Sequence, residues 1–126
     1  MERAQSLGRR RSAVRLGSLA DDLSSEARSL SKIASTEELR DISGMFQKVV
    51  NDGIVVQAKK MSENQHALTQ TQKQELLQKL TTKLAEAGQQ ADQAARESPP
   101  HAQPAFKTIS DTARDGQVKL KAILGA

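Results

Sequence analysis

Apolar residues recur at alternating steps of three and four along most of the chain, and this spacing constrains the fold more than any other feature. An α-helix has 3.6 residues per turn, so such positions fall on one of its faces. The spacing predicts an all-α fold of three to four amphipathic helices, packed as a helical bundle or coiled coil and possibly elongated. The clearest series is Leu77, Leu80, Leu84, Ala87, Ala91 and Ala94.

Prolines and capping patterns divide this periodic sequence. All three prolines lie between residues 98 and 105, and proline interrupts the hydrogen-bond ladder of a helix, so we expect a break at 98–104. Ser35 with Glu38 forms a capping box that would start a helix at Thr36. The run 62–65 repeats the pattern, so it either starts a third helix or the preceding helix runs on through it. We therefore predict helices at 19–34, 36–60, 63–97 and 104–124.

The segment 49–56 has two interpretations. It reads Val-Val-Asn-Asp-Gly-Ile-Val-Val, and two β-branched stretches around a turn sequence are typical of a β-hairpin. Helical periodicity surrounds it on both sides, which favours a helix with a bend. We prefer the helix and keep the hairpin as the alternative.

The basic charge is concentrated at the N-terminus. Residues 1–17 hold five arginines and one glutamate, whereas the remainder holds 14 basic and 14 acidic residues, so this segment accounts for the net charge of +4. Few apolar residues accompany the arginines. We predict a flexible basic arm over 1–17, followed by a helical domain over 18–126.

Three roles are open for this arm. It could contact the phosphates of nucleic acid through its arginines, it could be a mitochondrial presequence, or it could be a solvated tail that docks on an acidic partner. The arginines that would contact phosphates are Arg9, Arg10, Arg11 and Arg15.

Neither catalysis nor a cofactor is indicated by the sequence. Cysteine is absent, and no nucleophile or phosphate-loop motif is present. Glu63 and His66 share the spacing of helical metal-ligand pairs, but a di-iron site needs a second such pair. We interpret these two residues as a solvent-facing polar pair and predict a non-enzymatic protein without metal or cofactor. No apolar run could span a membrane, so we expect a cytoplasmic protein.

The predicted helices differ in length, and this difference points to contact with another chain. The helix 63–97 would be roughly 50 Å long, about twice the length of the first, so it would either bend near Gly88 or pack its overhang against another chain. With only two aromatic residues, internal burial is limited. We expect a protein–protein interaction module, either a homo-oligomer or a small subunit of a larger assembly, and a nucleic-acid-binding accessory protein as the alternative. The same apolar rows could instead form an internal core. The expected partner-binding residues are Leu77, Leu80, Leu84, Ala87, Ala91, Phe106, Ile109, Leu120 and Ile123.

Overall fold

The protein is an all-α bundle, as the spacing of apolar residues predicts. The computed structural model describes the backbone of residues 2–63 and 68–125, and the side chains within these ranges from residue 11 onward. Within these residues, helices form four long rods and no strand is present. The elements are α1 (Glu2–Leu30), α2 (Thr36–Lys48), the π-helix η1 (Val49–Ile54), α3 (Val55–Glu63), α4 (Gln70–Glu97), the 3₁₀-helix η2 (Pro100–Ala102) and α5 (Gln103–Leu124).

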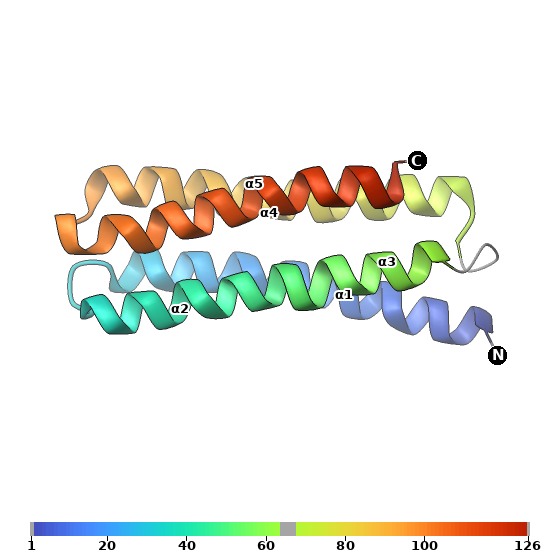
Figure 1. The fold of residues 1–126 in the computed structure, drawn as a ribbon, viewed down its shortest axis with the longest axis horizontal. Coiled ribbons are helices and arrows are strands. Elements are labelled where there is room, and N and C mark those ends of the chain that lie inside the picture. The colour runs from blue at the N-terminus through green and yellow to red at the C-terminus, as the bar shows by residue number, and fades with distance from the viewer. Residues whose placement is uncertain (1, 64–67, 126) are drawn as a thin grey trace.

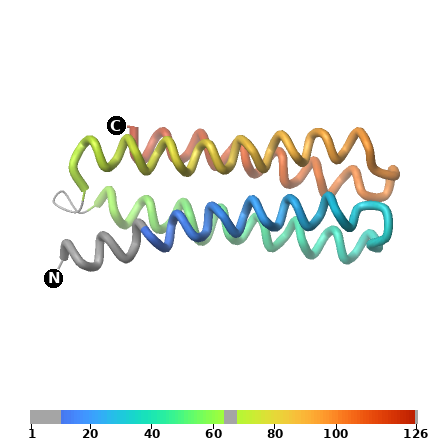
Figure 2. Tube along the Cα trace, turned by 180° about the vertical axis from the view of Figure 1, so that it is seen from behind, coloured from blue at the N-terminus to red at the C-terminus, as the bar shows by residue number. Residues whose placement is uncertain are grey.

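The four rods are arranged as two antiparallel hairpins lying side by side (Figures 1 and 2). In the first, α1 packs against the continuous rod formed by α2, η1 and α3. In the second, α4 packs against α5. The hairpins meet through α1 against α4 and through the α2–α3 rod against α5. The start of α1, the end of α3, the start of α4 and the end of α5 therefore lie towards one end of the bundle (Figure 1).

The first helix starts much earlier than predicted. It begins at Glu2 rather than near residue 19, and Ala13 on its inner face is fully buried. Residues 11–17 are therefore part of the bundle and do not belong to a flexible arm. The predicted boundary between arm and helical domain at residue 17 is wrong. Their inner face is built from small residues, Ala13 and Gly17, which do not stand out in a hydrophobicity pattern. Gly17 faces α4, since a Cβ there would lie 3.4 Å from Leu80 Cδ2, which is an ordinary contact distance.

The earlier start makes three of the rods nearly equal in length. Helix α1 has 29 residues and α4 has 28, and the rod Thr36–Glu63 also has 28, from segments of 13, 6 and 9. Helix α4 starts at Gln70, where Thr69 and Gln72 form the capping box. At 1.5 Å per residue it is about 42 Å long. The bundle therefore closes without the overhang expected of the 63–97 helix.

Of the other three predicted helix starts, two are confirmed and one is wrong. Ser35 caps α2 with Glu38 as its capping-box partner, and α5 follows the proline break within one residue of its predicted start. The capping box expected over 62–65 does not start a helix, because α3 runs on to Glu63. The hydroxyl of Ser62 instead donates to the Lys59 carbonyl within that helix.

The segment 49–54 is helical, so the hairpin alternative is wrong. It forms a π-helix, which is wider than an α-helix, and this changes which residues face the core. Three-four spacing after Phe46 would place Val49, Gly53 and Val56 on the inner face, but Val49 and Gly53 are only half-buried and Val56 is exposed. The fully buried residues follow Phe46 at successive steps of four, namely Val50, Ile54 and Ala58.

The rods approach closely where glycines face their neighbours. A Cβ on Gly116 of α5 would lie 2.7 Å from Val50 Cγ1 and 3.1 Å from Leu84 Cδ1. A Cβ on Gly53 would lie 2.9 Å from Leu16 Cδ1. These two glycines let leucine and valine side chains fill the middle of a core that contains only two aromatic rings.

Candidate functional site

The residues expected to bind a partner lie mostly inside the chain's own core. Leu77 and Ile123 are partly buried at the edge of this core, and the other seven are at most 1% exposed. In this bundle they pack against neighbouring helices of the same chain. They therefore form an internal core, which was the alternative to a partner-binding surface. The buried seven are Leu80, Leu84, Ala87, Ala91, Phe106, Ile109 and Leu120.

Formal charge divides the bundle into two unlike halves. Contacts of Gly17 with Leu80, of Gly53 with Leu16 and of Gly116 with Leu84 place these positions near the middle of the rods. We call the half that contains 2–17, 53–63, 70–83 and 117–125 the basic half; by backbone position it carries 12 basic and 3 acidic residues, a net charge of +9.

The acidic half contains 18–52 and 84–116, with 7 basic and 12 acidic residues, a net charge of −5. A field of this kind attracts polyanions to one half and repels them from the other.

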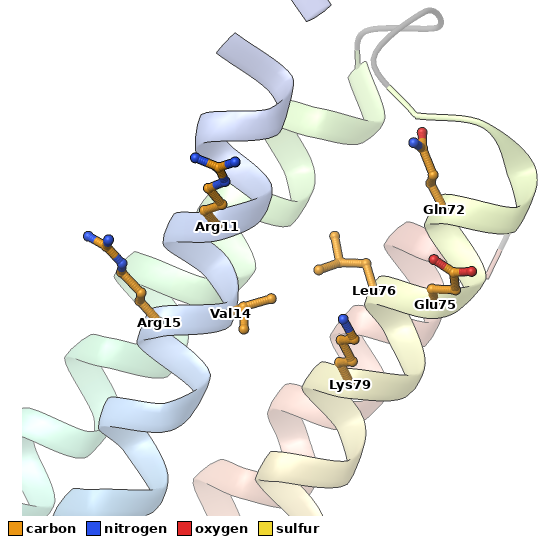
Figure 3. Close-up of a pocket in the computed structure, with 7 residues that line it drawn as sticks. All are labelled: Arg11, Val14, Arg15, Gln72, Glu75, Leu76 and Lys79. Carbon is orange, nitrogen blue, oxygen red and sulfur yellow. The ribbon is translucent and has the colours of Figure 1, made fainter. Parts of the chain in front are cut away.

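A groove opens in the basic half between α1 and α4 (Figure 3). Its volume is about 540 Å³, and a second hollow of about 540 Å³ adjoins it along α4 towards Lys83. Val14 and Leu76 point toward each other across the groove, and Arg15 points away from α4 (Figure 3). The first hollow is lined by Arg11, Val14, Arg15, Gln72, Glu75, Leu76 and Lys79.

The groove has a cationic rim with a single carboxylate. Arg11, Arg15 and Lys79 are exposed, and within the described residues none of them takes part in an ion pair. Lys83 lies 4.0 Å from Glu86, so it is only loosely paired. Cations without intramolecular partners keep their hydration and their counterions, which an incoming phosphate can displace.

Two of the four arginines predicted to contact phosphates are placed on this surface. Arg11 and Arg15 lie four residues apart in α1, so they share a side of the helix. For Arg9 and Arg10 the structure describes the backbone alone, in α1, and their side chains lie outside the described residues. The lysines of α4 were not predicted, because they join the arginines only when residues 11–17 form a helix beside α4.

The acidic half contains polar contacts that join different rods. Asp92 of α4 accepts from the Ser110 hydroxyl at 2.6 Å and from Arg114 at 2.8 Å, both in α5. Ser24 of α1 donates to the Ala87 carbonyl of α4 at 3.0 Å. The two turns at this end are joined by His101, whose Nε2 lies 3.1 Å from the Ala34 carbonyl.

Asp21 lies in the same half, in the α1–α4 interface. Its carboxylate accepts a long 3.5 Å hydrogen bond from Gln90. Burial raises the pKa of Asp21; nearby Lys83 opposes this increase, and the negative charges of Glu86 and Asp22 add to it. A carboxylate surrounded in this way stabilises the rod-to-rod contact less than a neutral group of the same shape would.

The remaining expectations concern metals and membranes. Glu63 is exposed at the end of α3, and His66 lies outside the described residues. Among the residues that were described, no three potential metal ligands are gathered together. No helix in that part of the chain combines the length and hydropathy needed to cross a bilayer. Comparison of the chain with protein-family models, with characterised proteins and with solved structures finds no match.

Proposed function

We propose that this protein is a non-enzymatic accessory protein that binds nucleic acid through the phosphates. The observation that carries the proposal is the separation of charge, with a net +9 in one half of a bundle whose total is +4. Phosphate contacts supply most of the affinity of sequence-independent nucleic-acid binding, and they need clustered cations rather than a particular fold. The cationic rim of the groove, with Arg11, Arg15 and Lys79, is the described part of this surface.

Binding of this kind would be largely independent of base sequence. Proteins that hold unpaired bases stack them on exposed aromatic side chains. The only two aromatic residues, Phe46 and Phe106, are fully buried in the core. The cations would therefore position the bundle on the sugar–phosphate backbone, with the acidic half directed away from it.

The decisive experiment compares two triple variants of equal net charge. The first, Arg11→Gln, Arg15→Gln and Lys79→Gln, removes three cations of the groove rim. The control, Arg40→Gln, Arg96→Gln and Lys107→Gln, removes three cations of the acidic half. All six side chains are exposed, so both variants should keep the fold, which circular dichroism checks.

Binding to duplex DNA and to RNA is measured by fluorescence anisotropy over a range of salt concentrations. Each phosphate contact contributes about 0.9 to the slope of log affinity against log salt for duplex DNA. The groove variant should lose about 2 to 3 units of slope, and the control should keep the slope of the unmodified protein. Equal loss in both variants, or no binding by the unmodified protein at low salt, would refute the proposal.

A role as a protein–protein interaction module remains a prediction, but the residues that suggested it no longer support it. The apolar rows on which it rested fill the core of this chain. A partner would therefore have to use other residues on the surface.

A further inference from the structure

The outer side of α1 carries a stripe of exposed residues with the spacing of a helix-pairing seam. From Arg15 the stripe continues at steps of four, three and four, and Arg11 lies four residues before it. This alternation keeps side chains along one line of a helix. Leu19 lies in the middle of the stripe and is 44% exposed. The stripe consists of Arg11, Arg15, Leu19, Asp22 and Glu26.

The charges of this stripe are poorly satisfied within a single chain. Arg11 and Arg15 form a like-charge pair four residues apart, and Asp22 and Glu26 form another. Such pairs destabilise an isolated helix. Within the described residues, none of the four takes part in an ion pair. The stripe thus holds two repulsive pairs of opposite sign on either side of an exposed leucine.

We propose that the stripe is a docking surface for a second copy of this chain, with the two α1 helices antiparallel. In an antiparallel pair, residues whose numbers have a constant sum face each other, and here the sum is 37. Arg15 then faces the partner's Asp22, and Arg11 faces the partner's Glu26. The symmetry axis passes close to Leu19, so Leu19 packs against the partner's Leu19.

Symmetry makes this arrangement self-limiting. The same patch serves both chains, so two copies close the interface and neither leaves the stripe unpaired. Each dimer gains one apolar contact and four ion pairs, because the two kinds of ion pair each occur twice by symmetry. A single pair of helices buries little surface, so the dimer is weak and reversible, and it depends on low ionic strength.

The proposal goes beyond nucleic-acid binding and does not depend on it. The two activities share Arg11 and Arg15, because the dimer would neutralise two cations of the groove rim in each chain. A polyanion and a second copy should therefore compete for the same side chains. Self-association measured without nucleic acid tests the docking surface alone.

The first test substitutes the central leucine. Leu19→Glu places a like charge at the symmetry axis from both chains, and we expect the dimer dissociation constant to rise about tenfold or more. Ile33→Glu is the matched control, since Ile33 is 81% exposed and lies outside the stripe. Sedimentation equilibrium at roughly 0.05 M salt measures both, and circular dichroism verifies that they are folded.

The second test exchanges the charges of one pair. Arg15→Asp alone and Asp22→Arg alone should each weaken the dimer about tenfold, because a like-charge contact arises twice by symmetry. The double variant restores opposite charges at the same positions and keeps the net charge of the unmodified chain, so it should regain the dimer. This regain distinguishes pairing from a general effect of charge.

Three results would overturn the docking surface. The unmodified chain could remain a monomer at high protein concentration and low salt. A dimer could form but not respond to Leu19→Glu. The double exchange could also stay as weak as the two single variants. Any of these leaves the nucleic-acid experiment unaffected.

Discussion

The two halves of the bundle are stabilised in different ways. In the acidic half, hydrogen bonds and ion pairs join neighbouring rods, as in the contacts of Asp92 with α5 and of Arg28 with Glu97 at 3.3 Å. In the basic half, the contacts between rods that the structure describes are packing contacts, among them Leu80 against Gly17 and Leu16 against Gly53.

This difference indicates which half a bound ligand would stabilise more. Positive charges that repel one another and are not bonded across helices make local opening easier. An external anion would stabilise the basic half, whose net charge of +9 is larger in size than the −5 of the acidic half. The proposed binding surface therefore lies in the half whose side chains leave the most charge uncompensated.

The largest expected effect is the loss of a core leucine from the basic half. Leu120 is fully buried, so Leu120→Ala should lower the free energy of unfolding by about 2–5 kcal/mol, because it removes apolar contacts and leaves a cavity. Urea denaturation measures the change. The control Val118→Ala, at a position that is 67% exposed, should stay within about 0.5 kcal/mol. A similar small loss for both would mean that packing does not stabilise this half.

A smaller effect is expected from a polar contact of the acidic half. Asp92→Ala removes the acceptor of the Ser110 hydroxyl, whose residue is only 3% exposed. An unsatisfied buried hydroxyl costs about 1–3 kcal/mol. Hydrogen exchange should show faster opening in the acidic half and unchanged rates in the basic half.

The control for this variant is Asp115→Ala, which breaks an exposed ion pair with Lys119 within one helix and should cost about 0.5 kcal/mol or less. Faster exchange along the whole bundle in Asp92→Ala would show that the two halves open together rather than separately.

The smallest effect concerns Asp21 and depends on pH. Its pKa in the folded protein is raised above 3.8 by burial, so the folded state binds this proton more tightly than the unfolded chain does. The charged carboxylate therefore lowers stability at neutral pH, and this loss disappears as pH falls through the raised pKa to 3.8 and below.

Asp21→Asn keeps the shape of the side chain and removes the charge. The variant should be slightly more stable than the unmodified protein at pH 7, and the difference should vanish below pH 3.8, as measured by urea denaturation at both pH values. A difference that is the same at both would show that charge at Asp21 is not the cause.

Much of the fold could be predicted from periodicity and turn chemistry. The last helix was placed correctly because prolines precede it and its face from Phe106 to Leu120 repeats at helical spacing. The start of α2 followed from the capping box of Ser35. Both signals are local, and the structure keeps them because packing agrees with them.

The start of α1 could not be predicted in this way. Its inner face before residue 19 uses Ala13 and Gly17, which bury well only when α4 lies close by. Arginine and serine around them resemble a solvated tail. Missing these residues made the first helix too short and suggested an overhang that does not exist.

The candidate site was predicted only in part for the same reason. Arg11 and Arg15 stand out in the sequence, but Lys79 and Lys83 look like ordinary surface lysines of a helix. Their significance comes from the contact between α1 and α4. The exposed position of Leu19 also could not be predicted, because helical spacing alone does not say which side of a helix its neighbours cover.

The π-helix of the second rod has a consequence for how this chain can change during evolution. A π-turn arises when a helix accommodates one additional residue while the turns on both sides keep their contacts. Loss of one exposed residue there, such as Asp52, would let the rod become an uninterrupted α-helix. Val50 and its neighbours would then have to rotate relative to Gly116, so the close fit at the centre of the bundle ties the length of this rod to the packing of α5.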